Sequence, residues 1–281
     1  MRVAWLLLPL LAGPVLADAL DDASRPVQVV ASTGLWAAWA SVLVATMMPR
    51  TVSLTALRIV APAAGIAVLA AVAVGHESVP WRLGGSVIVL VAVGMAFAPS
   101  TSHAFLNGSA YGDEQRFALR IPGPLLLGVV QGVWAVVVAG AVAGPLLLAA
   151  KQWVVGALVL VVGCAAVSWG TRVLHTLARR WVVLVPAGMV LHDQLALRDP
   201  VLLRRGEVVA FGPAPAGSDA LDLSRGALGL AVEVHLKDQV PLGVLADRRG
   251  RPAATVDADR LLLTPTRPGA LLTAAHSRRI G

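Results

Sequence analysis

The chain is poor in charged residues and nearly free of cysteine. Only 14% of its 281 residues are charged, whereas an average soluble domain carries about 25%. With a mean hydropathy of +0.76, this deficit argues against an ordinary soluble protein and for an integral membrane protein. The single cysteine, Cys164, excludes an intrachain disulfide. It lies in an apolar run, where a thiol behaves as a small apolar side chain.

The motifs of common enzyme classes are also missing. The sequence has no H-E-x-x-H zinc motif, no G-x-x-x-x-G-K-[ST] phosphate loop and no serine elbow. His103, Asp113 and Glu114 are too far apart to suggest a metal site. The apolar runs contain essentially no ionisable residues, so the polar groups of a coupled transporter or a membrane protease are lacking. We expect a protein that is not an enzyme and has no cofactor or metal.

The acidic residues that are present are divided unevenly. Six of the 16 lie before Trp181, and ten follow it. Long apolar runs dominate up to Arg180, and beyond it charge recurs every few residues. The sequence therefore predicts an α-helical transmembrane domain at 1–180 and a small, mostly-β soluble domain with a C-terminal helix at 181–281.

Six apolar runs approach the roughly 20 residues that a membrane-spanning helix needs. They lie at 3–20, 27–48, 57–75, 83–98, 121–149 and 153–171. The first run also fits a signal peptide, with Val15-Leu16-Ala17 as its cleavage site. We favour an uncleaved first helix, because the apolar run continues to Leu20 and another run follows after a short turn.

Basic residues in the short loops predict the orientation of the helices. With the amino terminus inside, the inner side collects Arg2, Arg50, Arg58, Arg116, Arg120, Arg172, Arg179 and Arg180, and the outer side collects Arg25, Arg82 and Lys151. We therefore expect a multi-pass protein of the plasma membrane with both termini in the cytoplasm. The long loop 99–120 then lies on the same side as the soluble domain, and we expect the two to dock.

Polar residues within the apolar runs are few. Gln131 is the most polar of them, and the others are Ser32, Thr33, Ser41, Ser86 and Ser168. Gln131 could contact a solute in a pore, or it could make a hydrogen bond between helices worth about 0.6–2 kcal/mol. We favour the hydrogen bond.

The last third of the sequence has the pattern of short strands with turn residues between them. Strands are predicted at 181–185, 189–192, 201–203, 207–211, 227–237 and 260–264, followed by a helix at 269–279. In the run 227–237, Leu228 and Leu230 belong to an alternating series that predicts one buried face and one wet face. These strands indicate a small antiparallel barrel or sandwich.

Two stretches of this region resemble parts of bacterial pleckstrin-homology-like domains. Arg180–Asp193, with the sequence RWVVLVPAGMVLHD, resembles their first hairpin, and Leu263–Leu272, LTPTRPGALL, resembles their last strand and closing helix. The segment 213–217 departs from a tight barrel. The whole chain is also similar to uncharacterised multi-pass membrane proteins of high-GC Gram-positive bacteria, a resemblance that implies no activity.

Two basic clusters are the candidate binding residues of the soluble domain. They consist of Arg204 and Arg205, and of Arg248, Arg249 and Arg251. Such residues attract anionic lipid with about 1 kcal/mol each near a membrane surface, although solvated loops are the simpler interpretation. With 12 basic and 10 acidic residues, the tail has a net charge of only +2, so nucleic acid is not an expected partner.

These observations lead to two functional hypotheses. The first is a non-enzymatic scaffold or anchor whose cytoplasmic β-domain binds lipid headgroups, a protein partner or a second copy of the chain. The alternative is a small transporter or channel component with a regulatory cytoplasmic domain.

Overall fold

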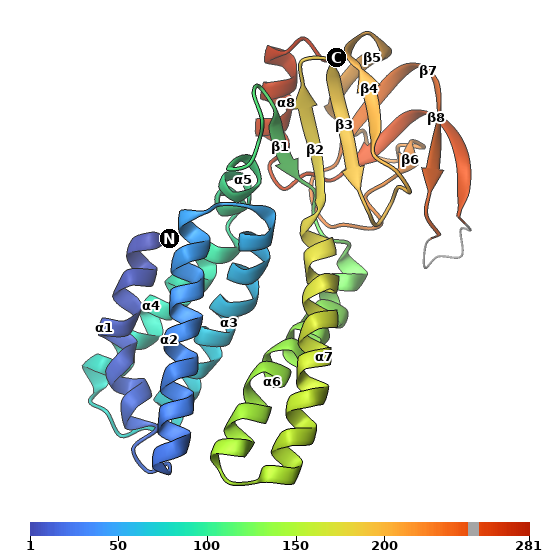
Figure 1. Ribbon diagram of the computed structural model, residues 1–281. Coiled ribbons are helices and arrows are strands. Elements are labelled where there is room, and N and C mark those ends of the chain that lie inside the picture. The colour runs from blue at the N-terminus through green and yellow to red at the C-terminus, as the bar shows by residue number, and fades with distance from the viewer. Residues whose placement is uncertain (247–252) are drawn as a thin grey trace. The chain divides into compact units, whose positions relative to one another are not determined.

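The computed structural model describes residues 1–246 and 253–281 (Figure 1). The chain divides into two compact units, each built from two stretches of sequence. The first unit comprises Met1–Phe105 and Gly132–Leu174, and the second comprises Leu106–Gln131 and His175–Gly281. The second unit thus includes 106–131, a stretch that the expected division between residues 180 and 181 left with the membrane helices.

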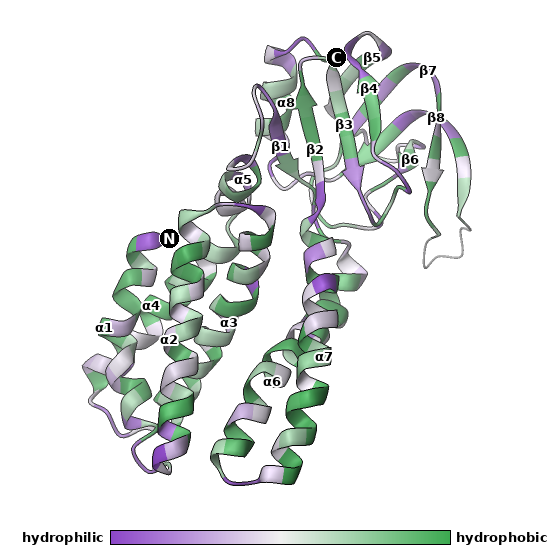
Figure 2. Cartoon of the chain, in the orientation of Figure 1, coloured by the Kyte–Doolittle hydropathy of each residue, from purple (hydrophilic) through white to green (hydrophobic). Residues whose placement is uncertain are grey.

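The first unit consists of helices. They are α1 (Arg2–Asp18), α2 (Arg25–Met47), α3 (Thr51–Val74), α4 (Val79–Phe97), α6 (Val130–Ala149) and α7 (Trp153–Ala178), with the short α5 (Pro99–Asn107) after α4. Helices α1 to α4 share an apolar core that includes Trp5, Ala12, Leu57 and Val89. Figure 2 shows hydrophobic residues along most of each long helix.

Among the residues that the structure describes, five helical segments are long and apolar enough to cross a membrane. They are α2, α3, α4, the segment Leu125–Ala149 that contains α6, and α7. Helix α1 has only 17 residues, so the expected count of six membrane helices is not confirmed. It nevertheless packs within the bundle, where the indole N–H groups of Trp5 and Trp39 each donate to the other residue's carbonyl oxygen at 2.9 Å.

Pro122 and Pro124 predict that the apolar segment 121–149, which leads into α6, is broken near its start. Leu125–Val129 forms a short π-helical stretch in which Leu127 and Gly128 leave helical geometry. Gly128 has a φ of 113°, a conformation that favours glycine. The apolar segment is therefore interrupted near its beginning.

The second unit is mostly β-structure. Its strands are β1 (Gln115–Ala118), β2 (Arg180–Val185), β3 (Gly188–Asp193), β4 (Val201–Arg204), β5 (Val208–Pro213), β6 (Leu221–Asp222), β7 (Val232–Val244) and β8 (Ala254–Leu263), and helix α8 (Pro268–Ser277) follows. They form two sheets, ordered β1-β2-β3-β4 and β5-β7-β8-β6. Both sheets and α8 contribute to one core, which includes Val182, Leu191, Phe211, Leu261 and Leu271. This confirms a mostly-β domain with a C-terminal helix.

Strand β1 comes from the loop 99–120 between two apolar helices. It pairs antiparallel with β2, and Phe117 lies opposite Val182. Phe117 is only 3% exposed and belongs to the core of the domain. The expected docking of this loop is therefore confirmed, and it takes the form of an added strand. Four residues are too few for an alternating pattern to predict the strand itself.

The strand expected at 227–237 begins later, at Val232, and continues to Val244. Leu228 and Leu230 precede it and are 71% and 75% exposed, so their assignment to a buried strand face is wrong. Gly226 and Gly229 explain the difference, with φ angles of 75° and 130°. These positive φ angles are incompatible with a regular strand.

Candidate functional site

The face of the first sheet that points away from the core is the candidate site. Its residues, here called the outer face, are Arg116, Trp181, Val183, Val190, His192, Leu202 and Arg204. The strand register places them on one side, because Arg116 lies opposite Val183 and Trp181 opposite His192. Their alternating neighbours, such as Leu184 and Met189, are fully buried. Strand alternation alone therefore separates the core from the candidate site.

A stacked pair of rings lies at one end of this face. The rings of Trp181 and His192 are 4.8 Å apart, with an angle of 12° between their planes. Burial lowers the pKa of the His192 imidazole below its ordinary value of 6.5, and the nearby Arg179 and Arg116 lower it further against the opposing effect of Asp193. Its Nε2 atom is buried and has no hydrogen-bond partner among the described residues. His192 is therefore held mainly in its neutral form at pH 7.

The side chain of Arg116 lies over one ring of the stacked pair. The guanidinium carbon of Arg116 lies 6.0 Å from the centre of the Trp181 ring, within the range of a cation–π contact. Arg116 also forms an ion pair with Glu114 at 3.0 Å and donates to the Ser109 hydroxyl at 3.3 Å. The Glu114 carboxylate offsets one of the positive charges on this face.

The reverse side of the same strands holds a buried ion pair. Arg180 donates from Nε and Nη2 to the two carboxylate oxygens of Asp193 at 2.7 and 2.6 Å, and from Nη1 to the carbonyl oxygen of Arg120 at 2.6 Å. The side chains of Arg180 and Asp193 are 1% and 3% exposed. The sequence predicted that Arg180 marks the cytoplasmic end of a membrane helix. Its guanidinium is instead paired with the Asp193 carboxylate inside the β-domain. As expected for neighbours on a strand, His192 and Asp193 lie on opposite faces.

The predicted basic clusters are placed differently from one another. Arg204 is exposed on the outer face, opposite Gly188. Arg205 begins a short 3-10 turn and donates from Nη2 to the carbonyl oxygen of Pro186 at 2.6 Å, which fixes it to the β2–β3 turn. Arg248, Arg249 and Arg251 lie outside the described residues.

Gln131 has a local role at the interrupted start of α6. Its Oε1 atom accepts a hydrogen bond from the backbone N–H of Gly128 at 2.9 Å. The break leaves that N–H without its helical partner, and an unpaired amide is costly in a membrane. The bond favours a structural role for Gln131, although it runs within one segment and not between helices.

Arg58, expected among the basic residues of the inner loops, lies inside an apolar helix. Helix α3 begins at Thr51, so Arg58 lies about two turns into the helix and not at its end. Its Nη2 atom donates to the buried Ser102 hydroxyl at 2.6 Å, and its guanidinium carbon is 5.8 Å from the centre of the Phe97 ring. The earlier helix start could not be read from hydropathy, because 51–56 mixes polar and apolar residues.

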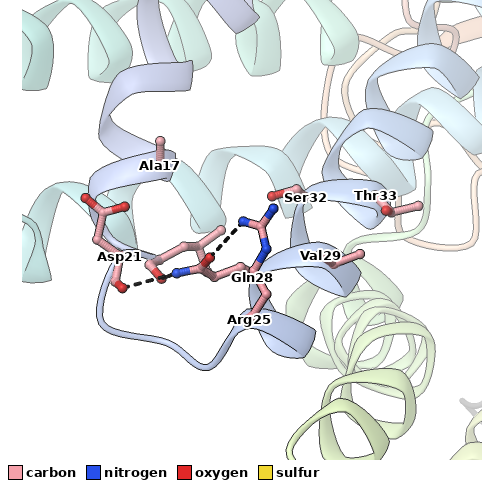
Figure 3. A pocket seen from close by; sticks show the side chains of 8 residues that line it. Ala17, Asp21, Arg25, Gln28, Val29, Ser32 and Thr33 are labelled. Carbon is pink, nitrogen blue, oxygen red and sulfur yellow. Dashed lines mark hydrogen bonds between the residues drawn. The ribbon is translucent and has the colours of Figure 1, made fainter.

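A shallow pocket lies where α1 connects to α2 (Figure 3). It has a volume of about 370 Å³ and is lined by Ala17, Leu20, Asp21, Arg25, Gln28, Val29, Ser32 and Thr33. Among its lining residues, Gln28 donates hydrogen bonds from Nε2 to the carbonyl oxygens of Leu20 and Asp21, both at 3.1 Å. The charged side chains, Asp21 and Arg25, are exposed, so the pocket lacks the buried polar groups of a specific site.

Glu233, Ser218 and His235 form a second polar cluster in the β-domain. The Glu233 carboxylate accepts from the Ser218 hydroxyl at 2.6 Å and lies 2.5 Å from His235 Nε2. Both partners contact Glu233, and the serine is not bonded to the histidine, so the arrangement lacks the order of a catalytic triad. Within the described part of the chain, no group of three or more His, Cys, Asp or Glu side chains could hold a metal ion.

Comparisons with protein-family models, with curated proteins and with solved structures find no match for the chain. The resemblance to bacterial pleckstrin-homology-like domains stays a prediction.

Proposed function

We propose that the chain is a non-enzymatic scaffold of the plasma membrane that binds a protein partner through the outer face of its first sheet. Both termini lie in the cytoplasm in this proposal, which counts the 17-residue helix α1 as a sixth spanning helix beside the five longer ones. The five membrane-length helices support a membrane location, and the arginines of the inner loops support the orientation. The bound segment of the partner would carry acidic and apolar side chains.

The observation that carries this proposal is the mixed chemistry of the outer face. Leu202 is 45% exposed, and the half-buried Trp181–His192 pair offers aromatic surface beside it on the same sheet. Tryptophan and arginine are enriched in the residues that dominate binding energy at protein interfaces. Two acids lie near the arginines of this face: Glu114 pairs with Arg116 at 3.0 Å, and the Glu207 carboxylate accepts from the backbone N–H of Arg204 at 2.8 Å. Together with Arg179, which is close enough to lower the pKa of His192, the arginines outnumber these two acids, which favours an acidic partner.

The position of Arg204 favours a protein over lipid headgroups as the partner. Helix α7 ends at Ala178 and β2 begins at Arg180, so the chain passes from an apolar helix directly into this strand. Arg204 lies at the opposite end of the sheet, opposite Gly188, whereas Asp193 pairs with Arg180. Six residues of strand separate these ends by about 16–20 Å. A site for lipid headgroups would be better placed at the end of the sheet that carries Arg180, because that end directly follows the apolar helix α7.

Photo-crosslinking in cells tests this proposal. A benzophenone amino acid placed at Leu202 should form a discrete adduct with a protein, and the adduct should be lost when Arg204→Glu reverses the local charge. Two changes serve as controls: the same probe at Val209, which is 62% exposed in β5, and Lys237→Glu, a charge reversal at an exposed position of β7.

The outcomes separate the two kinds of partner. An Arg204-dependent protein adduct at Leu202, absent with the probe at Val209, supports the docking face. Lipid adducts alone, equal labelling at both positions, or loss of the adduct in Lys237→Glu as well would contradict it.

A further inference from the structure

The segment Gly226–Ala231, here called the leucine loop, exposes two large apolar side chains to solvent. Packing within the β-domain does not explain why they are exposed. Leu228 and Leu230 are 71% and 75% exposed, and the regular strand begins only at Val232. Single exposed leucines are common on soluble proteins. Two of them on one six-residue loop need a partner that removes them from water.

The leucine loop is fixed in place at both ends. The carbonyl oxygen of Gly226 accepts from the backbone N–H of Gly123 at 3.2 Å, and the carbonyl oxygen of Ala231 accepts from Ala214 at 3.1 Å. Before the loop, Arg225 donates to the carbonyl oxygens of Leu245 and Ala246 at 3.1 and 2.7 Å. The two leucines are therefore presented at a defined position.

That position lies beside the start of a membrane-length helix. A Cβ atom at Gly123 would lie 3.5 Å from Leu228 Cγ, so the two residues are neighbours. Two residues beyond Gly123 begins Leu125–Ala149, one of the five segments able to span a membrane. Leu126 and Leu127 at its start are themselves 43% and 80% exposed. Leu228 therefore lies next to the chain two residues before this exposed apolar segment begins.

An arginine completes the arrangement. A Cβ atom at Gly229 would lie 2.7 Å from Arg120 Nε, so the Arg120 side chain lies directly against the loop, and it is exposed. A basic residue next to exposed leucines is the pairing that interfacial membrane segments use, with the cation at the phosphates and the apolar groups just below them.

We propose that the leucine loop inserts Leu228 and Leu230 into the headgroup–acyl boundary of the bilayer, where Arg120 meets the lipid phosphates. The loop and the Leu125–Ala149 segment thus hold the β-domain against the membrane together. This inference goes beyond the proposed docking of a protein and shares with it only the membrane location.

Site-specific fluorescence in lipid vesicles tests the inference with the full chain. In a Cys164→Ala background, Leu228→Cys, Leu230→Cys and Val209→Cys are each labelled with the environment-sensitive dye NBD and reconstituted in phosphatidylcholine. All three positions are exposed, so neither leucine substitution removes core packing. Val209 in β5 controls for any tendency of the dye itself to enter lipid.

The expected result is a blue-shifted emission at positions 228 and 230. Lipids with a nitroxide near the headgroup end of the acyl chain should also reduce the fluorescence there, and both effects should be absent at 209. Water-like emission at positions 228 and 230 would overturn the inference. A blue shift that the lipid nitroxide does not quench would overturn it too, because such a shift means that the dye is buried against protein and not in lipid. A failed crosslink at Leu202 would leave this result unaffected, so the two proposals can fail separately.

Discussion

The β-domain surrounds a charged pair with large apolar side chains, whereas the α6–α7 helix pair brings its backbones together at glycines. In the β-domain, Arg180 and Asp193 are almost fully buried, on the face of β2 and β3 that also carries the buried Val182 and Leu191. In α7, Gly156, Gly163 and Gly170 are the buried residues, and they recur every seven positions. Burial of large apolar groups drives folding in water. In lipid that driving force is absent, and close van der Waals contact between small residues takes its place.

The largest effect is expected from breaking the charged pair of the β-domain. Arg180→Met leaves Asp193 buried without its partner, which should lower the free energy of unfolding by about 3–5 kcal/mol. Chemical unfolding of the full chain in detergent, followed at the β-domain, measures this change. The double variant Arg180→Met/Asp193→Leu removes both charges and should recover much of the stability. If Arg180→Met unfolds like the unchanged protein, the pair is not buried as described.

A smaller effect is expected from separating α6 and α7. A Cβ atom at Gly163 would overlap the carbonyl group of Gly140, so Gly163→Val should cost about 1–3 kcal/mol through overpacking. The matched control is Gly94→Val in α4, where nothing lies within 4 Å of an added Cβ. Thermal aggregation of the detergent-solubilised variants compares the two. Equal behaviour of both variants would contradict close packing of α6 on α7.

The smallest effect concerns His192 and depends on pH. Because burial and Arg179 lower the pKa of the folded-state imidazole below 6.5, the unfolded chain binds a proton at a higher pH than the folded chain does. Stability contributed by neutral His192 is therefore complete above pH 6.5 and is lost as pH falls towards the lower folded pKa. His192→Gln should flatten this part of the pH–stability profile of the β-domain. A profile that is identical in both proteins would remove His192 as its cause.

Hydropathy and alternation predicted the division into apolar helices and a β-rich region, because both patterns are local. Most strands were also found, including the β2–β3 hairpin. The register of that hairpin also predicts the ion pair between Arg180 and Asp193, because a two-residue turn at Pro186–Ala187 places these two residues opposite each other. Strand β1 could not be predicted, because a four-residue strand depends on a partner more than sixty residues away in sequence.

The candidate site was predicted only in part for the same reason. Arg204 was selected as a member of a basic cluster, but the other residues of the outer face, among them Arg116, Trp181 and His192, come from three other strands. The exposed leucines of the leucine loop were assigned to a buried face, because their alternation with small residues imitates a strand. Only the positive φ angles of Gly226 and Gly229 separate the two cases.

The loop between two apolar helices and the C-terminal region form one β-domain, and the outer face depends on this union because Arg116 comes from β1. Arg116 and Val183 lie directly opposite each other, where paired Cβ atoms are about 4.5–5.5 Å apart. Val190 shares this face but lies one strand further, at about 10 Å from β1.

Oxidation of paired cysteines in membranes is the most direct measurement. In a Cys164→Ala background, we expect Arg116→Cys/Val183→Cys to form an intramolecular disulfide and Arg116→Cys/Val190→Cys to form none, because the distance between positions 116 and 190 exceeds the reach of a disulfide. Failure of the first pair to form a disulfide, or equal yields from both pairs, would contradict the account.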